Sequence, residues 1–241
     1  MNILITGGAN GLGGAITRIL AKDKNNTVFF TCNKSVSQAE ALQKEFSNSV
    51  PIKCNFKDEA EVNNLAEKID TLGLDVLINN AYTGDAIKTH FHKIPVEDFL
   101  TGFKENILPV ITLTQSAIKS FRKNKKSGKI ITILSSYLLN TPPAGSSVYV
   151  ANKSYLWSLV KTWATENARF NITSNSISPS FMQTDFTKDV DERLIEQMIQ
   201  NHPLKKLLSL NEVAEVVLFF VNASQQVNGT DMIVNAGVNI K

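Results

Sequence analysis

The sequence predicts an α/β protein built on a doubly wound parallel sheet of seven strands, with helices on both faces. Short runs rich in Ile and Val alternate along the chain with longer amphipathic segments, and few charges interrupt the short runs. Strands of this kind are typical of a sheet covered on both faces, and strand–helix alternation favours right-handed crossovers between parallel strands. A glycine-rich segment, from Gly7 to Gly14, joins the first apolar run to the first amphipathic one.

The expected elements follow from these patterns by residue number. We expect strands at 2–5, 27–32, 51–54, 76–78, 129–134, 172–177 and 232–234. We expect helices at 11–22, 37–46, 60–72, 96–119, 148–168 and 211–221. The last helix has a defined start, because Ser209 and Glu212 have the spacing of a capping box.

Composition indicates one domain over residues 1–241. Hydrophobic residues make up 43% of the chain and charged residues 20%, as in ordinary globular proteins. No Pro-, Gly- or Ser-rich linker divides the sequence. The least regular stretch, 181–208, is long for a loop in a compact domain. Because such loops are often functional, we expect a substrate-side lid there.

Charge and hydropathy argue against several classes of protein. The formal net charge of +3 is too small to indicate nucleic-acid binding. No stretch approaches the ~20 apolar residues that span a bilayer, and the N-terminus lacks the pattern of a signal peptide. We therefore expect no membrane association and a cytoplasmic location. The basic run at 122–126 is interpreted as a solvated helix end, and alternatively as a docking patch for an acidic carrier protein.

The cysteines and histidines do not indicate a metal site. Cys32 and Cys54 each close a short strand-like run, without the CxxC spacing of metal or redox sites. We interpret them as buried free thiols that lie close together on neighbouring strands. His90 and His92 have no further candidate ligand near them in the sequence and are interpreted as loop surface.

The glycine-rich segment predicts a phosphate-binding turn. Gly7, Gly11 and Gly13 have the spacing G-x-x-x-G-x-G, between a strand and a helix. Glycines permit positive φ and close backbone approach, while the helix N-terminus offers N–H donors to an anion. The position at the first strand–helix junction indicates a dinucleotide-binding Rossmann fold rather than a turn made only for packing.

The end of the second strand bears on which dinucleotide binds. An acidic residue there usually holds the ribose 2′-hydroxyl of NAD, but this chain has Asn33 and Lys34. The absence of a carboxylate removes repulsion against a 2′-phosphate, and Lys34 is placed to neutralise one. We therefore predict NADP(H), with NAD(H) as the alternative. A simple surface role for Lys34 remains open, and Asn10 stands where a second basic residue would have strengthened the prediction.

Tyr149 and Lys153 are the candidate catalytic pair. They are four residues apart in an expected helix, so they lie on the same face. An ammonium near a phenol favours the phenolate, so we expect Lys153 to lower the pKa of Tyr149 towards a range useful for proton transfer. A hydroxyl from Ser135 or Ser136, which follow the fifth strand, is placed to hold a substrate oxygen. We favour Ser135, because strand register is harder to shift than loop length.

The order of these motifs resembles the short-chain dehydrogenase/reductase superfamily over essentially the whole chain. The sequence contains T-G-x-x-x-G-x-G, then Asn79-Asn80-Ala81, then a strand-end serine and Y-x-x-x-K. Further matches are Asn106, the segment from Pro179 to Thr184, and the terminal segments Asn228-Gly229-Thr230 and Asn235-Ala236-Gly237. The 3-oxoacyl-carrier-protein reductases are the members it resembles most.

The resemblance implies roles for the matched residues. Tyr149 would be the general acid/base, and Lys153 would lower its pKa and bind the nicotinamide ribose. Ser135 or Ser136 would orient the carbonyl, and Asn106 would support a water-linked proton relay. With the residues after the second strand, the implied cofactor site comprises Thr6, Gly7, Asn10, Gly11, Leu12, Gly13, Asn33, Lys34, Asn55, Phe56, Asn80, Ala81, Tyr149, Lys153, Pro179, Ser180, Met182 and Thr184.

Three departures from the family pattern affect the site or its surroundings. Tyr82 replaces the glycine of N-N-A-G and brings an aromatic ring towards the substrate side. Ser180 replaces the glycine after Pro179, and Asn235-Ala236 replaces Asp-Gly. None of these changes removes a catalytic group. We expect them to alter pocket shape and contacts between subunits.

The substrate crevice is expected beyond the carboxyl ends of the strands, and its expected lining is apolar and aromatic. The candidates are Tyr82, Tyr137, Leu138, Leu139, Pro142, Pro143, Phe181, Met182 and Phe186. We predict NADP(H)-dependent reduction of a 3-oxoacyl thioester, free or bound to a carrier protein, or of a similar ketone, as in fatty-acid or polyketide synthesis. The alternatives are a secondary-alcohol, steroid or sugar dehydrogenase in the oxidative direction, and a non-catalytic dinucleotide-binding regulator. The resemblance also implies a homotetramer or homodimer.

Overall fold

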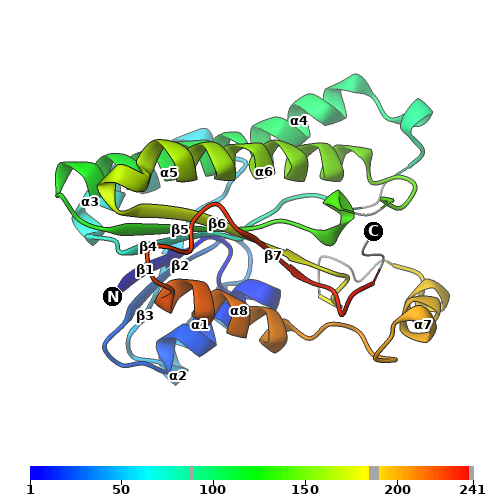
Figure 1. Ribbon diagram of the computed structural model, residues 1–241, viewed down its shortest axis with the longest axis horizontal. Coiled ribbons are helices and arrows are strands. Elements are labelled where there is room, and N and C mark those ends of the chain that lie inside the picture. The colour runs from blue at the N-terminus through cyan, green and yellow to red at the C-terminus, as the bar shows by residue number, and fades with distance from the viewer. Residues whose placement is uncertain (87–88, 140, 185–189, 239–241) are drawn as a thin grey trace.

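The computed structural model describes residues 1–86, 89–139, 141–184 and 190–238, and contains one sheet of seven parallel strands (Figure 1). The strand order is β3-β2-β1-β4-β5-β6-β7. The strands are β1 (Asn2–Ile5), β2 (Thr27–Cys32), β3 (Ser49–Lys53), β4 (Val76–Asn79), β5 (Gly128–Ile133), β6 (Ile172–Pro179) and β7 (Asp231–Val234). The predicted fold class is thereby confirmed.

The helices cover both faces of this sheet (Figure 1). Those on one face are α1 (Gly11–Ala21), α2 (Val36–Glu45) and α8 (Leu210–Asn222). Those on the other are α3 (Glu59–Leu72), α5 (Leu108–Lys123) and α6 (Ser147–Asn167), with α4 (Val96–Asn106) packed against α5 and α6. The helix α7 (Glu192–Asn201) stands beyond the end of the sheet.

Alternation along the strands divides the interior into two cores. In β1, Ile3 and Ile5 pack with α1 and α8, whereas Leu4 packs on the opposite face with α3 and α5. All three side chains are fully buried. Successive strand residues point to opposite faces, so a run of apolar residues supplies both cores at once. This burial is the physical reason that the strands carry few charges.

The strand order reverses direction at β1. This strand pairs with β2 on one side and with β4 on the other, and the chain passes outward from it in both directions. Loops after β1 and β4 therefore separate to opposite faces, which leaves a crevice at the carboxyl ends of these two strands. The glycine-rich turn follows β1 and Asn80 follows β4, so both reach this crevice.

Three predicted elements differ from the structure. The helix predicted at 96–119 is two helices, α4 and α5, which meet at Ile107, and Pro109 lies in the first turn of α5. A proline lacks the N–H that a continuous helix would need there. The segment 181–208 contains α7, which the sequence interpretation missed. Strand β3 begins at Ser49, before Pro51, because an edge strand tolerates proline.

The basic run is partly neutralised in the structure. Lys123 Nζ lies 2.6 Å from Asp70 and Lys126 Nζ lies 2.7 Å from Asp75. These pairs join the end of α5 to the region where α3 leads into β4. Their carboxylates support the interpretation of the run as a solvated helix end. No helix in the described part of the chain has the length and apolarity of a bilayer-spanning segment.

The two cysteines are free, and their backbones lie side by side. The Cys54 N–H donates to the Cys32 carbonyl over 2.9 Å. Their side chains pack in different cores, Cys32 with α1 and Cys54 with α3, so the thiols face opposite sides of the sheet. Burial raises the pKa of Cys54 to about 11. Among the described residues, no group of three potential ligands could hold a metal ion.

Candidate active site

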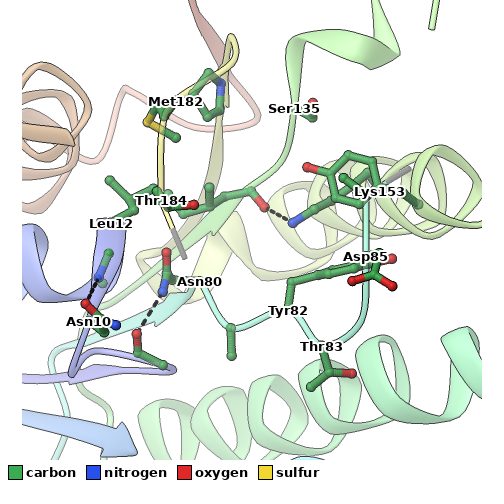
Figure 2. Close-up of a pocket in the computed structure, with 18 of the residues that line it drawn as sticks. Asn10, Leu12, Asn80, Tyr82, Thr83, Asp85, Ser135, Lys153, Met182 and Thr184 are labelled. Atoms are coloured by element: carbon green, nitrogen blue, oxygen red, sulfur yellow. Dashed lines mark hydrogen bonds between the residues drawn. The ribbon is translucent and has the colours of Figure 1, made fainter. Parts of the chain in front are cut away.

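A cavity of about 1080 Å³ lies at the carboxyl ends of the central strands. Figure 2 shows residues from several separate segments pointing into it. Predicted residues in its wall are Gly7, Asn10, Gly11, Leu12, Gly13, Asn33, Asn55, Phe56, Asn80, Ala81, Ser135, Tyr149, Lys153, Pro179, Ser180, Met182 and Thr184. The structure thus brings together most of the residues that the sequence assigned to cofactor and catalysis.

The glycine-rich turn is compact enough to require its glycines. A Cβ at Gly13 would lie 1.9 Å from the Gly7 carbonyl oxygen, which leaves no room for a side chain. Gly7 and Gly11 have φ angles of +65° and +52°, a conformation that favours glycine. The Asn10 side chain accepts a 2.7 Å hydrogen bond from the Gly11 N–H and caps α1. The N-terminus of α1 therefore faces the cavity and fits a dinucleotide phosphate.

The turn is fastened to the loop after β4. The Thr6 hydroxyl oxygen accepts from the backbone N–H groups of Asn80 and Ala81, over 2.9 and 3.0 Å. The Asn80 amide donates to the carbonyls of Thr6 and Gly7, over 2.9 and 3.2 Å. Thr6 itself is buried and is not part of the cavity wall. Thr6 therefore contributes to the predicted cofactor site indirectly, through its hydrogen bonds to the loop after β4.

At the far end of the cavity, the described wall residues after β2 and β3 include no carboxylate. Asn33 and Asn55 join the two loops by a 3.1 Å hydrogen bond between their side chains. Lys34 is exposed and does not line the cavity, whereas Lys57 does line it. Lys57 also forms a 2.9 Å ion pair with Glu105. Sequence reasoning missed Lys57, although it directly follows the predicted Asn55-Phe56 pair.

Ser135 is the serine that meets Tyr149. Both residues line the cavity, and hydrogen bonding by the Ser135 side chain acts to lower the pKa of Tyr149. Ser135 also caps a short 3₁₀ helix (Ser136–Leu138) by accepting from the Tyr137 N–H over 3.3 Å. Ser136 is buried and is not part of the wall. The prediction made from strand register, Ser135, is therefore the serine whose hydroxyl is better placed towards Tyr149.

Lys153 is 4% exposed, and its ammonium donates to the Ile133 carbonyl over 2.7 Å (Figure 2). Burial lowers its pKa to about 8. Burial also raises the pKa of Tyr149, although the hydrogen bond from Ser135 acts in the opposite direction. The pKa of Tyr149 is thus raised and not lowered in this structure, because desolvation of the phenolate is the largest influence on it. The expected action of Lys153 on this pKa stays a prediction.

Asn106 lies outside the cavity wall. At the end of α4, its side-chain oxygen accepts from the Thr83 N–H over 2.6 Å, and its amide donates to the Thr83 and Gly102 carbonyls. These bonds hold the loop after β4 against the junction of α4 and α5. Its expected part in a proton relay stays a prediction.

The substrate end of the cavity differs in part from the expected lining. Tyr82, Tyr137, Phe181 and Met182 are in the wall, as predicted. The predicted residues that the wall does not contain are Leu138, Leu139, Pro142 and Pro143. Leu138 packs into the core and Leu139 is turned outward, 37% exposed. Phe186 lies outside the described residues.

Several wall residues were not predicted. They are Thr31, Cys32, Cys54, Lys57, Thr83, Asp85, Ala86, Thr89, Ile133, Leu134, Val190, Asp191 and Leu194. Of the last three, Val190 and the N-cap Asp191 precede α7, and Leu194 lies in its first turn. A sequence signal for α7 existed, because Asp191 is a helix-capping residue and apolar residues recur at helical spacing after it.

The known proteins that this chain resembles in sequence include reductases. A family model described as enoyl-(acyl carrier protein) reductase matches residues 7–239. A 3-oxoacyl-[acyl-carrier-protein] reductase of Rickettsia conorii is 31% identical over 238 residues, covering 98% of this chain and 95% of the relative. Carbonyl reductase family member 4 of Xenopus laevis is 29% identical over 239 residues, covering 98% and 97%.

Solved structures give the same fold. A short-chain dehydrogenase of Burkholderia cenocepacia in complex with NADP has a TM-score of 0.86 at 25% identity, covering 99% of this chain and 97% of the other. An actinorhodin polyketide ketoreductase with NADPH has a TM-score of 0.87 at 22% identity, covering 100% and 97%. The second likeness supports the fold alone.

Replacing the buried ammonium should stabilise the cofactor-free protein near neutral pH. Lys153→Met is expected to raise the melting temperature at pH 7 by several degrees, because a buried charge carries a desolvation cost. The folded-state pKa is about 8 and the ordinary value is 10.5, so between these values the unfolded chain binds the proton that the folded chain has lost. Wild-type stability therefore rises with pH in this window, and the advantage of the variant shrinks.

Thermal unfolding of both proteins from pH 6 to 10.5 measures this effect. Lys161→Met is the matched control, since Lys161 is an exposed lysine of the same helix that lies over the Trp157 ring. A stability difference between Lys153→Met and wild type that does not change with pH would contradict the prediction.

Proposed function

The chain belongs to the short-chain dehydrogenase/reductase superfamily, and we propose that it uses NADP(H) to reduce a 3-oxoacyl thioester or a similar apolar ketone to a secondary alcohol. As a member of this superfamily it is an NAD(P)-dependent oxidoreductase. The observation that carries the proposal is that Ser135 and Tyr149 both line the cavity that the glycine-rich turn also lines. Two hydroxyls in one wall form a site for a carbonyl oxygen.

The residues of the chain position and donate the proton, while a bound nicotinamide would supply the hydride. Tyr149 keeps its proton at neutral pH, because burial raises its pKa, and so acts as a general acid towards the substrate oxygen. Ser135 donates a hydrogen bond to the same oxygen. The Lys153 ammonium lies 5.8 Å from the centre of the Tyr149 ring and stabilises the phenolate that remains.

The character of the wall supports an uncharged, apolar substrate. Phe181, Met182 and Leu194 supply apolar surface to the wall, and Asp85 and Asp191 add negative charge. Among the described wall residues, the cations are Lys57 and Lys153. The start of α7, within 181–208, thus forms part of the substrate side. We propose that this segment acts as the lid over a substrate carried as a thioester, free or on a carrier protein.

Removing the phenol should abolish turnover without abolishing cofactor binding. Tyr149→Phe is expected to lower kcat for acetoacetyl thioester reduction by about 100- to 10,000-fold, the contribution of a positioned general acid. NADPH oxidation measures kcat, and NADPH fluorescence measures binding. Tyr155→Phe, a tyrosine of the same helix that packs on Phe103, is the matched control.

The same assay separates carbonyl from alkene reduction. The matching family model is described as an enoyl reductase, so crotonyl and acetoacetyl thioesters are compared side by side. Turnover of acetoacetyl thioester is expected to dominate, because Ser135 and Tyr149 converge on one oxygen. Full activity in Tyr149→Phe, or turnover of the crotonyl thioester alone, would overturn the proposal.

The proposed preference for NADP(H) depends on the missing carboxylate after β2, and the short-chain dehydrogenase solved in complex with NADP supports it. Lys34→Glu is expected to raise the KM for NADPH by about tenfold, since an exposed attraction becomes a repulsion. The KM for NADH should stay unchanged. Lys24→Glu, an exposed charge change beside Phe46, is the control. A wild-type enzyme that prefers NADH would contradict the assignment.

We propose a homotetramer or homodimer in solution. Helix α4 leaves large apolar side chains exposed, with Val96 at 70% and Leu100 at 68%. A chain of 26.6 kDa should therefore elute from size-exclusion chromatography with light scattering at a multiple of that mass. A monomer at micromolar concentration would contradict this.

A further inference from the structure

Tyr82 lies in the loop after β4. It directly follows Asn80 and Ala81, which hydrogen-bond to Thr6. Its side chain is half-buried and lines the cavity, and Figure 2 shows it on the same side of the cavity as Thr83 and Asp85. The family pattern has a glycine at this point, so the ring is a feature of this chain. Its surroundings show what the ring does.

The Tyr82 ring meets the ring of Tyr149 edge to face. The ring centres are 5.0 Å apart and the planes are inclined at 74°, a favoured geometry for aromatic pairs. Tyr137 makes a second such contact with Tyr149, at 6.2 Å and 79°. The Tyr149 ring is therefore held by two aromatic neighbours as well as by its hydroxyl.

Tyr82 also contacts two neighbours of Tyr149 on α6. The Lys153 ammonium lies 5.2 Å from the centre of the Tyr82 ring, within the ~6 Å range of a cation–π contact. The Tyr82 hydroxyl oxygen accepts a 3.3 Å hydrogen bond from the Asn152 amide. Tyr149, Asn152 and Lys153 are spaced i, i+3 and i+4, so one side chain contacts a single face of the helix.

We propose that Tyr82 is a positioning residue that holds the Tyr149 ring and the Lys153 ammonium in their reactive arrangement. It acts through these two groups and does not itself transfer a proton. Burial raises the pKa of Tyr82 to about 12, so its hydroxyl stays neutral while it accepts from Asn152. The inference rests on the proposed role of Tyr149. It predicts an effect on kcat rather than on cofactor binding.

Two variants separate the ring of Tyr82 from its hydroxyl. Tyr82→Phe keeps the ring contacts and loses the bond from Asn152, so kcat should stay within about threefold of wild type. Tyr82→Leu keeps much of the bulk and loses the ring, so kcat should fall by about tenfold, the value of one aromatic pair. The Kd for NADPH, measured by fluorescence, should be unchanged in both.

A control variant at Tyr155 and a second variant at Tyr82 make each outcome decisive. Tyr155→Leu makes the same change on the outer side of α6, where the Tyr155 ring packs on Phe103, and should keep wild-type kcat. If Tyr82→Leu fails to fold by circular dichroism, Tyr82→Met supplies a ring-free side chain that adapts to its surroundings. Wild-type kcat in the folded ring-free variant would overturn the inference, as would an equal loss in NADPH binding. Retained turnover in Tyr149→Phe would instead overturn the proposed function, so the two failures are distinguishable.

Discussion

The hydrogen bonds between Thr6 and Asn80 are the constraint on which the rest of the site depends. They join the ends of β1 and β4, the two neighbouring strands between which the strand order reverses. Asn80 reaches the glycine-rich turn through the Gly7 carbonyl, and the next residues of its own loop lead to Tyr82. One short contact therefore sets both the cofactor end and the reaction end of the cavity. Without it, the two loops would be placed relative to each other only by the pairing of β1 with β4.

The reaction end depends on a different force, the removal of water. Burial favours the neutral form of both Tyr149 and Lys153, raising the pKa of the phenol and lowering that of the ammonium. The Ile133 carbonyl and the Ser135 hydroxyl offset part of this effect by hydrogen bonding. The same burial therefore shifts the two pKa values in opposite directions.

The local sequence pattern predicted the features that depend on neighbouring residues, such as strand bounds and strand register. The strand Thr27–Cys32 was predicted at its observed bounds, because apolar alternation and burial coincide there, and register chose Ser135. The break after Asn106 was missed, because apolar periodicity continues across it while the side chain of Asn106 binds a distant loop. The pKa direction of Tyr149 was also missed, since burial is a property of the folded chain. The wall residues from α7 were missed although their helix begins with a recognisable cap.

The cavity is assembled from two sources that the chain keeps apart. The turn after β1 and the loops after β2 and β3 form the dinucleotide end, whereas residues before and within α7 form much of the opposite end. Sequence change within α7 therefore leaves the turn after β1 and the loops after β2 and β3 unchanged. Such a division allows an ancestral gene to diverge in what it accepts while inheriting its source of reducing power unchanged. It also marks α7 as the element to exchange when a different carbonyl specificity is wanted from this scaffold.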